Sequence, residues 1–160
     1  MKQKIILWLT GYDWTEFSIA YYMQKTQNYE FYAIIDVQNN PKEFFENQTL
    51  VPFKKIWFYH DHINSSSTKK NDIIRTFEKK YNIPTIPLAK NDRIFMEKFN
   101  VFHKFSELEI CHIVENECNL FETVLDEINP DFFLSLETAF RPHHFFYLLC
   151  KTRNVKVLML

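Results

Sequence analysis

The residues best able to do chemistry follow short apolar runs of the sequence. Glu137 comes after the run 131–136, and Arg141 follows four positions later. A carboxylate at such a place can act as a base or hold a ligand hydroxyl, and a guanidinium can grip a phosphate or a carboxylate with two hydrogen bonds. The alternative is that the two side chains pair with each other or cap the next helix. Glu137 is therefore a candidate catalytic residue, and Arg141 a candidate substrate-binding residue.

The first apolar run, 5–9, is followed after one threonine by Gly11, Tyr12 and Asp13. Gly11 is the only glycine of the chain, and only there can a backbone without a Cβ atom approach a ligand closely. A tight turn into the next helix explains the same glycine equally well. Asp13 and Glu16 have the spacing of a capping box, so Asp13 is also expected to cap that helix.

The third apolar run, 53–59, is followed by His60, Asp61 and His62. Two histidines one residue apart can share a metal ion if the backbone is extended, and Asp61 could add an oxygen ligand. No further ligand pattern accompanies them, and surface loops often carry such residues for solubility. The motif stays open between a metal site, a substrate-contacting loop and an ordinary polar loop. We predict no metal site and keep His60 as a candidate substrate contact.

The remaining histidine pair and the cysteines are interpreted as structural residues. His143 and His144 are adjacent, so on a helix they point about 100° apart and cannot easily chelate one ion; we expect both on the helix surface. Cys111, Cys118 and Cys150 share no C-x-x-C spacing and lie among apolar residues. We expect buried thiols rather than disulfides or zinc ligands.

Composition excludes several classes of function. A single glycine leaves no room for a G-x-G-x-x-G motif or a P-loop. The chain has 19 basic and 20 acidic side chains, a net charge of −1, and no basic stripe for nucleic acid. No stretch reaches the ~20 apolar residues of a membrane span, and the apolar run near the N-terminus is too short for a signal peptide. We expect a cytoplasmic protein.

Short apolar runs alternate with amphipathic segments along the chain, as strands alternate with helices in α/β proteins. We predict strands at 5–9, 29–36, 53–59, 131–136 and 155–160, and helices after Asp13, at 41–47, 72–81, 92–99 and 106–129, and from Pro142. The two prolines of 83–88 allow a short or edge strand at best. Residues 60–72 are predicted to form a long surface loop.

This alternation predicts a doubly wound, mainly parallel sheet between two layers of helices, with right-handed crossovers. Ligands of such sheets bind beyond the carboxyl ends of the strands, near the point where the strand order reverses. Gly11, His60 and Glu137 would then gather along one rim. The length fits a single domain, 1–160. An apolar strand with nothing after it would leave an exposed edge, so we expect the N-terminal half of a longer protein.

A family resemblance lies in the opening KIILWLTGYDWTEFSIAYYM, in the later segment NPDFFLSLETAFRPHHFFYLLCKTRNVKVLML and in the capped helix between them. They resemble the N-terminal half of two-domain glycosyltransferases of the GT-B type, in the group that acts in capsule or surface polysaccharide synthesis. The resemblance implies two Rossmann-like domains that face each other across a cleft. The N-terminal domain would bind a glycan or lipid-linked acceptor, and a C-terminal domain would bind the nucleotide-sugar donor.

The resemblance also implies roles for particular residues. Gly11, Tyr12, Asp13 and Glu137 would line the acceptor side of the cleft. No metal or cofactor is implied for this half, peripheral contact with a membrane is compatible with it, and the 160 residues alone should be inactive.

The competing hypothesis is a non-catalytic α/β module that binds a small ligand or a protein partner. A receiver-type site would need an aspartate at the end of the third strand, where the sequence has Tyr59 and His60.

Overall fold

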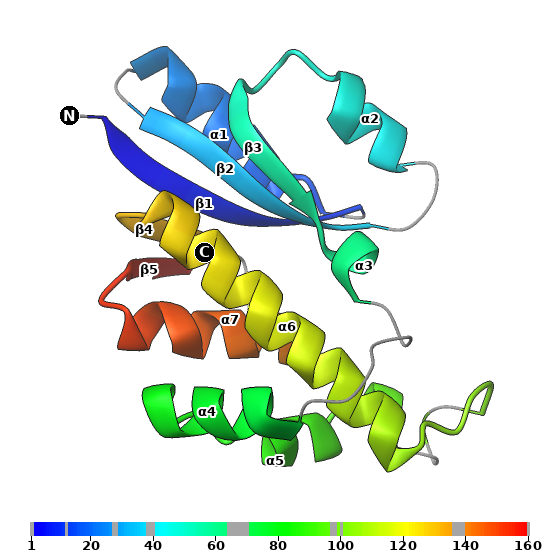
Figure 1. Cartoon of the computed structure of the whole chain (residues 1–160). Helices are drawn as coiled ribbons and strands as arrows, with labels where there is room; N and C mark the ends of the chain where they lie inside the picture. Colours follow the sequence, from blue (N-terminus) through cyan, green and yellow to red (C-terminus); the bar gives the residue numbers. More distant parts are fainter. Residues whose placement is uncertain are drawn as a thin grey trace.

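A computed structural model of the chain contains one sheet of five parallel strands with helices on both of its faces (Figure 1). The structure describes residues 2–11, 13–26, 29–37, 41–63, 71–96, 99, 101–135 and 140–159. The strands are β1 (Gln3–Thr10), β2 (Tyr29–Asp36), β3 (Phe53–Phe58), β4 (Phe132–Ser135) and β5 (Lys156–Met159). Their parallel pairing confirms the predicted Rossmann-like α/β fold.

The strand order is β3-β2-β1-β4-β5, so the order reverses between β1 and β4. The chain first builds outward from β1 to β3, then crosses back and continues on the other side of β1. Leu7 of β1 is in register with Leu134 of β4, which brings the carboxyl ends of these two strands together. This is the switch point where doubly wound folds form their ligand crevice.

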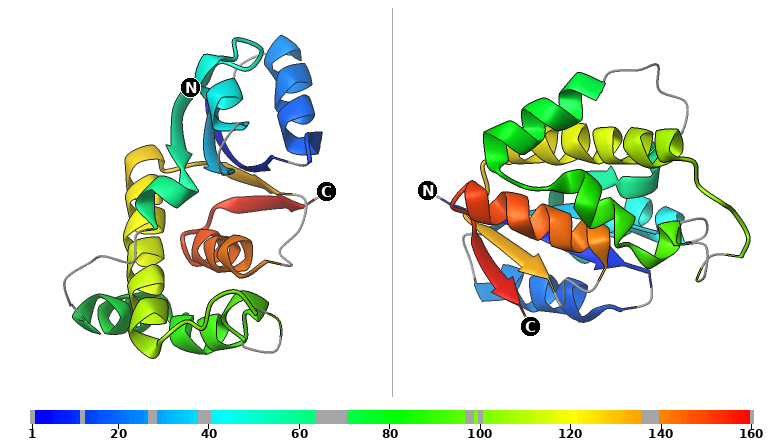
Figure 2. Two further views of the ribbon diagram at one scale, coloured as in Figure 1. Left: turned by 90° about the vertical axis from the view of Figure 1, so that its right-hand side faces the viewer. Right: turned by 90° about the horizontal axis from the view of Figure 1, so that it is seen from below.

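The helices form a layer on each face of the sheet, and one face carries a further layer outside it (Figure 2). The first face is covered by α1 (Thr15–Thr26) and α2 (Pro41–Asn47), and the second by α6 (Glu107–Ile128) and α7 (Arg141–Thr152). Outside these lie α4 (Asn71–Tyr81) and α5 (Thr85–Lys90), both against α6. The short α3 (Tyr59–His62) and the 3₁₀ helix η1 (Arg93–Phe95) complete the described elements.

The core has two halves because β1 is buried on both faces. Ile5, Leu7 and Leu9 pack toward α1 and α2, whereas Ile6 and Trp8 pack toward α6 and α7. This alternation follows from the two-residue period of a strand, and the continuous apolar run is typical of a central parallel strand. Burial of each such side chain stabilises the fold by roughly 1.5–3 kcal/mol.

The two helices that lead to the site begin as the sequence predicts. Ser106 and Glu109 form the reciprocal capping box of α6, and Asn129 ends that helix in the left-handed conformation with φ 47°. Pro142 lies in the first turn of α7, where its missing N–H costs nothing. The expected helix at Pro41–Asn47 is confirmed.

Three predicted elements were wrong. Residues 83–88 are not a strand: Thr85–Lys90 is a helix, and Pro87 is tolerated because it lies in the first turn. Where a helix was expected at 92–99, the described residues form the 3₁₀ turn Arg93–Phe95. The loop expected from residue 60 begins with the helical turn α3. Within the part of the chain that the structure describes, no helix has the length and apolarity needed to cross a membrane.

Candidate functional site

A carboxylate and two imidazoles meet at the carboxyl end of β2. Asp36 is the last residue of that strand, His60 lies in α3, and His143 lies in the first turn of α7. The Nε2 atom of His60 is 2.9 Å from Asp36 Oδ1, and the Nε2 atom of His143 is 3.6 Å from Asp36 Oδ2. We call these three residues the Asp36 cluster. It lies at the edge of the sheet where parallel α/β folds bind their ligands.

The contacts of Asp36 keep its side chain ionised. Burial by itself raises the pKa of this carboxyl, but the nearby His143 and His60 rings outweigh burial and hold the pKa well below its usual range. The cluster therefore has a fixed negative charge at its centre.

Two buried nitrogen atoms beside the cluster have no hydrogen-bond partner among the described residues. They are Nε1 of Trp8 and Nδ1 of His143, and their rings lie 4.5 Å apart, centroid to centroid. The two residues are 1% and 5% exposed. An unsatisfied buried polar group costs about 1–3 kcal/mol, and most such groups in proteins have a partner.

A second polar network is centred on Glu117 of α6 and includes Tyr59, the residue before His60. Arg141 donates to both carboxylate oxygens of Glu117, with Nη2 2.9 Å from Oε1, and its Nε donates to Asp92 Oδ2 at 2.8 Å. Tyr59 donates its hydroxyl hydrogen to Glu117 as well. The Glu117 side chain is fully buried, and that of Arg141 is nearly so. The network ties α7 to α6 and to the turn at η1.

The role of this network is structural. Burial and the nearby Glu117 carboxylate raise the pKa of Tyr59, so its hydroxyl stays protonated. Burial alone would lower the pKa of Arg141. The Glu117 carboxylate raises this pKa by more than burial lowers it, so the guanidinium stays charged. Tyr59 directly precedes His60, and the centroid of the Tyr59 ring lies 5.6 Å from that of Trp8. The network therefore fixes the position from which His60 reaches Asp36.

Arg141 was predicted to bind substrate, and the structure directs its guanidinium inward. All three of its nitrogen atoms are engaged by Glu117 and Asp92. The bidentate grip on a carboxylate that the sequence suggested is present, with a carboxylate of the chain itself as the partner. The expected pairing partner, Glu137, lies outside the described residues.

The residues after β1 lie at the same edge of the sheet. Gly11 is partly exposed and has no positive φ, so a left-handed turn is not the reason for a glycine there. Asp13 accepts a hydrogen bond from the backbone N–H of Thr15, the first residue of α1, at 2.9 Å. This hydrogen bond lowers the pKa of Asp13. Tyr12 lies outside the described residues.

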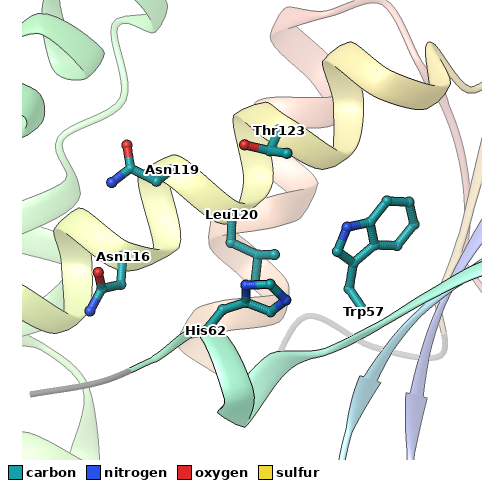
Figure 3. A pocket seen from close by; sticks show the side chains of 6 residues that line it. All are labelled: Trp57, His62, Asn116, Asn119, Leu120 and Thr123. Carbon is teal, nitrogen blue, oxygen red and sulfur yellow. The ribbon is translucent and has the colours of Figure 1, made fainter.

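The histidine motif after β3 is divided among three different contacts. His60 joins Asp36, whereas Asp61 pairs with Lys42, Nζ to Oδ2 2.6 Å. His62 lines a hollow of about 250 Å³ together with Trp57 and the α6 side chains Asn116, Asn119, Leu120 and Thr123 (Figure 3). The described part of the chain contains no group of three side chains that could hold a metal ion.

Sequence reasoning missed two functional candidates. His143 was predicted at the helix surface but is buried, because α7 turns the face that carries His143 and Phe146 toward the sheet. Their spacing of three residues was the signal. Glu117 interrupts the apolar stripe of α6 between Val114 and Phe121, and a charged residue inside such a stripe points to a buried partner.

Comparison with known proteins adds no family to this description. No protein-family model matches the sequence. No curated protein and no solved structure matches it either. The assignment of a function therefore depends on the geometry of the Asp36 cluster and on the resemblance in the sequence.

Proposed function

We propose that the chain is the acceptor-side domain of a sugar transferase and that the Asp36 cluster receives the acceptor hydroxyl. The observation that carries the proposal is the pair of buried, unpartnered nitrogen atoms of Trp8 and His143 next to an ionised carboxylate. A hydroxyl group can both donate and accept hydrogen bonds. It is therefore suited to a place that offers an indole N–H, an imidazole nitrogen and a carboxylate.

The chemistry proposed for the cluster is general base catalysis. His60 takes the proton of the acceptor hydroxyl, and Asp36 orients the ring and stabilises the positive charge that the ring gains. The acceptor oxygen then forms a bond to the anomeric carbon of the donor sugar. The bond from that carbon to the nucleoside diphosphate breaks, and its electron pair leaves with the phosphate oxygen. His60 is partly exposed, as a base that meets a substrate must be.

The donor belongs to a different part of the proposed enzyme. Following the resemblance, the nucleotide-sugar is held by a second domain outside these 160 residues. The resemblance assigns Gly11, Tyr12, Asp13 and Glu137 to the acceptor side, and in this proposal Arg141 acts through Glu117 and Tyr59 as a positioning residue.

A non-catalytic ligand-binding module is the second candidate. It is favoured by the way the charged groups neutralise one another, since Asp36 has two imidazoles and Glu117 has Arg141. Such a site would hold a polar ligand by hydrogen bonds to Trp8 and His143 without any proton transfer. Only the transferase requires His60 as a base.

Binding can be tested on the chain itself with the ring signals of its six histidines in NMR spectra. Methyl glycosides, which imitate an acceptor, are added to protein labelled at histidine. We expect the signals of His60 and His143 to move with saturation, while those of His103 and His144 stay. If no glycoside moves the His60 and His143 signals, the acceptor proposal is wrong.

A matched pair of variants separates the two candidates. His60→Gln should weaken glycoside binding by about two- to tenfold, as expected for the loss of one hydrogen bond between neutral groups, and His144→Gln should not. In the protein with its donor domain, His60→Gln should also reduce kcat by about 10²–10⁴, the usual contribution of a general base. Unchanged kcat would favour the binding module.

A further inference from the structure

The polar side chains of α6 that have no permanent charge lie in one row along the helix. They are His112, Asn116, Asn119 and Thr123, which we call the polar row, and their spacings of four, three and four residues place them on one face. Apart from the cysteines, every other polar side chain of α6 is a carboxylate. Asparagine and threonine favour a helix less than glutamate does, so helix stability alone does not explain the row. Departures from local preference are expected at functional sites.

Three members of the polar row, all except His112, line the hollow beside α3 (Figure 3). Trp57 of β3 and His62 of α3 lie across from them, and Leu120 adds an apolar side chain. The hollow has a volume of about 250 Å³. Pockets for drug-sized ligands measure about 300–1,000 Å³, so this hollow has room for one small ring.

The polar groups of the hollow are open to a ligand. Within the described part of the chain, the side chains of Asn119, Thr123 and His62 have no hydrogen-bond partner. His112, the first member of the polar row, is 8% exposed, and its buried Nε2 atom has no partner among the described residues either. An amide group and a hydroxyl group can each donate and accept. The row therefore suits a ligand that donates and accepts hydrogen bonds at several positions.

The lining of the hollow selects against charged ligands. None of the described side chains that line it has a permanent charge, whereas phosphates and carboxylates are bound by cationic side chains and Mg²⁺ or Ca²⁺ by carboxylates. The ring of Trp57 is not open for stacking on a flat aromatic ligand, because the residue is 4% exposed and Nζ of Lys55 lies 4.7 Å from the ring centroid. These features favour a small uncharged ring with several hydroxyl groups.

We propose that the hollow between α3 and α6 binds an uncharged, hydroxyl-rich ring, as found in neutral sugars and in cyclitols. Asn119 and Thr123 bind its hydroxyl groups, and Leu120 packs against its C–H groups. The site is separate from the Asp36 cluster, although α3 carries one residue of each. The inference goes beyond sugar transfer and does not require it.

The test is a titration of the chain followed by NMR through the indole N–H signal of Trp57 and the ring signals of His62. The probes are the methyl glycosides of glucose, galactose and mannose, myo-inositol as the cyclitol, and methyl glucuronide as a charged analogue. We expect a neutral probe to move both sets of signals with saturation. The glucuronide should bind at least about tenfold more weakly, because no side chain of the hollow pairs with its carboxylate. A response to the glycosides alone assigns the hollow to sugars, and a response to inositol alone assigns it to cyclitols.

A matched pair of variants tests the role of the polar row. Asn119→Ala should weaken binding of the neutral probe by about two- to tenfold, as expected for the loss of hydrogen bonds between neutral groups. Alanine is a better helix former than asparagine, so this variant should stay folded. The control Asn47→Ala changes an exposed asparagine of α2, on the other face of the sheet, and should bind like the unaltered chain.

Three results would overturn the inference. They are no movement of the Trp57 and His62 signals with any neutral probe, equal binding of the glucuronide, and unchanged binding by Asn119→Ala. The signals of the Asp36 cluster report on the proposed function separately. If only the signals of the cluster move, the hollow is wrong and the acceptor proposal stands. If only those of Trp57 and His62 move, the hollow stands and the acceptor proposal is wrong.

Discussion

Two imidazole rings from different elements reach one carboxylate at the end of β2. Because the folded pKa of Asp36 lies below its unfolded value of about 3.9, its contacts stabilise the fold above about pH 4, and this stabilisation is lost as the pH falls further. The difference in free energy of unfolding between the unaltered chain and Asp36→Asn should therefore shrink between about pH 5 and about pH 2.5. Urea unfolding at a series of pH values measures it.

A surface carboxylate provides the control for this pH dependence. Asp61→Asn removes the exposed partner of Lys42 and should change the free energy of unfolding by less than about 1 kcal/mol at every pH. A constant difference for Asp36→Asn across the acid range would mean that the imidazole contacts do not hold Asp36 ionised.

The buried pair of Glu117 and Arg141 should be far more sensitive to substitution than pairs at the surface. Glu117→Gln removes the bidentate carboxylate partner of the buried Arg141 guanidinium, which then keeps only Asp92, and should lower the free energy of unfolding by about 3–5 kcal/mol. Glu127→Gln, on the same helix, breaks a half-exposed pair with Lys55 and should cost less than about 1 kcal/mol. Chemical denaturation compares the two. Equal losses would contradict the structural role of the network.

Individual site residues could be predicted only where the backbone alone places them. Gly11, His60 and Asp36 follow strands, so their position at the carboxyl edge follows from a parallel sheet. The burial of His143 and the inward turn of Arg141 depend on how α7 packs on the sheet. That rotation is set by tertiary contacts, which the local sequence does not contain.

At the scale of elements, the capping box of Ser106 and Glu109 fixes the start of α6, the helix that carries Glu117. Ser106→Ala removes the side-chain acceptor for the Glu109 N–H and should lower the free energy of unfolding by about 0.5–2 kcal/mol. Ser18→Ala changes an exposed serine in the middle of α1 and should be neutral or slightly stabilising. Thermal and urea unfolding of both variants check this. A neutral Ser106→Ala would show that packing alone holds the start of α6.

Elements with strong local signals were predictable, and short elements were not. The capped α6 and the five apolar strands follow from spacing and capping residues. Two prolines made 83–88 resemble an edge strand, although Pro87 falls in the first turn of α5, where proline fits. The single turn α3 is formed by contacts of Tyr59 and His60 with residues far along the chain.

For the whole molecule, the sequence predicts a parallel sheet but not the order of its strands. The order β3-β2-β1-β4-β5 places the reversal between β1 and β4, and His60 of α3 and His143 of α7 both reach Asp36. Strand order depends on which faces the crossover helices cover, and right-handed crossovers leave more than one order open. The cluster therefore became visible only in three dimensions.

A crystal structure of the chain with a bound methyl glycoside tests the central claim most directly. We predict a sugar hydroxyl within hydrogen-bond distance of His143 Nδ1 or Trp8 Nε1, with His60 beside it. An ordered sugar bound only in the hollow lined by Trp57 and His62 would contradict the proposal that the Asp36 cluster receives the acceptor. So would an empty edge of the sheet at glycoside concentrations that saturate binding in solution.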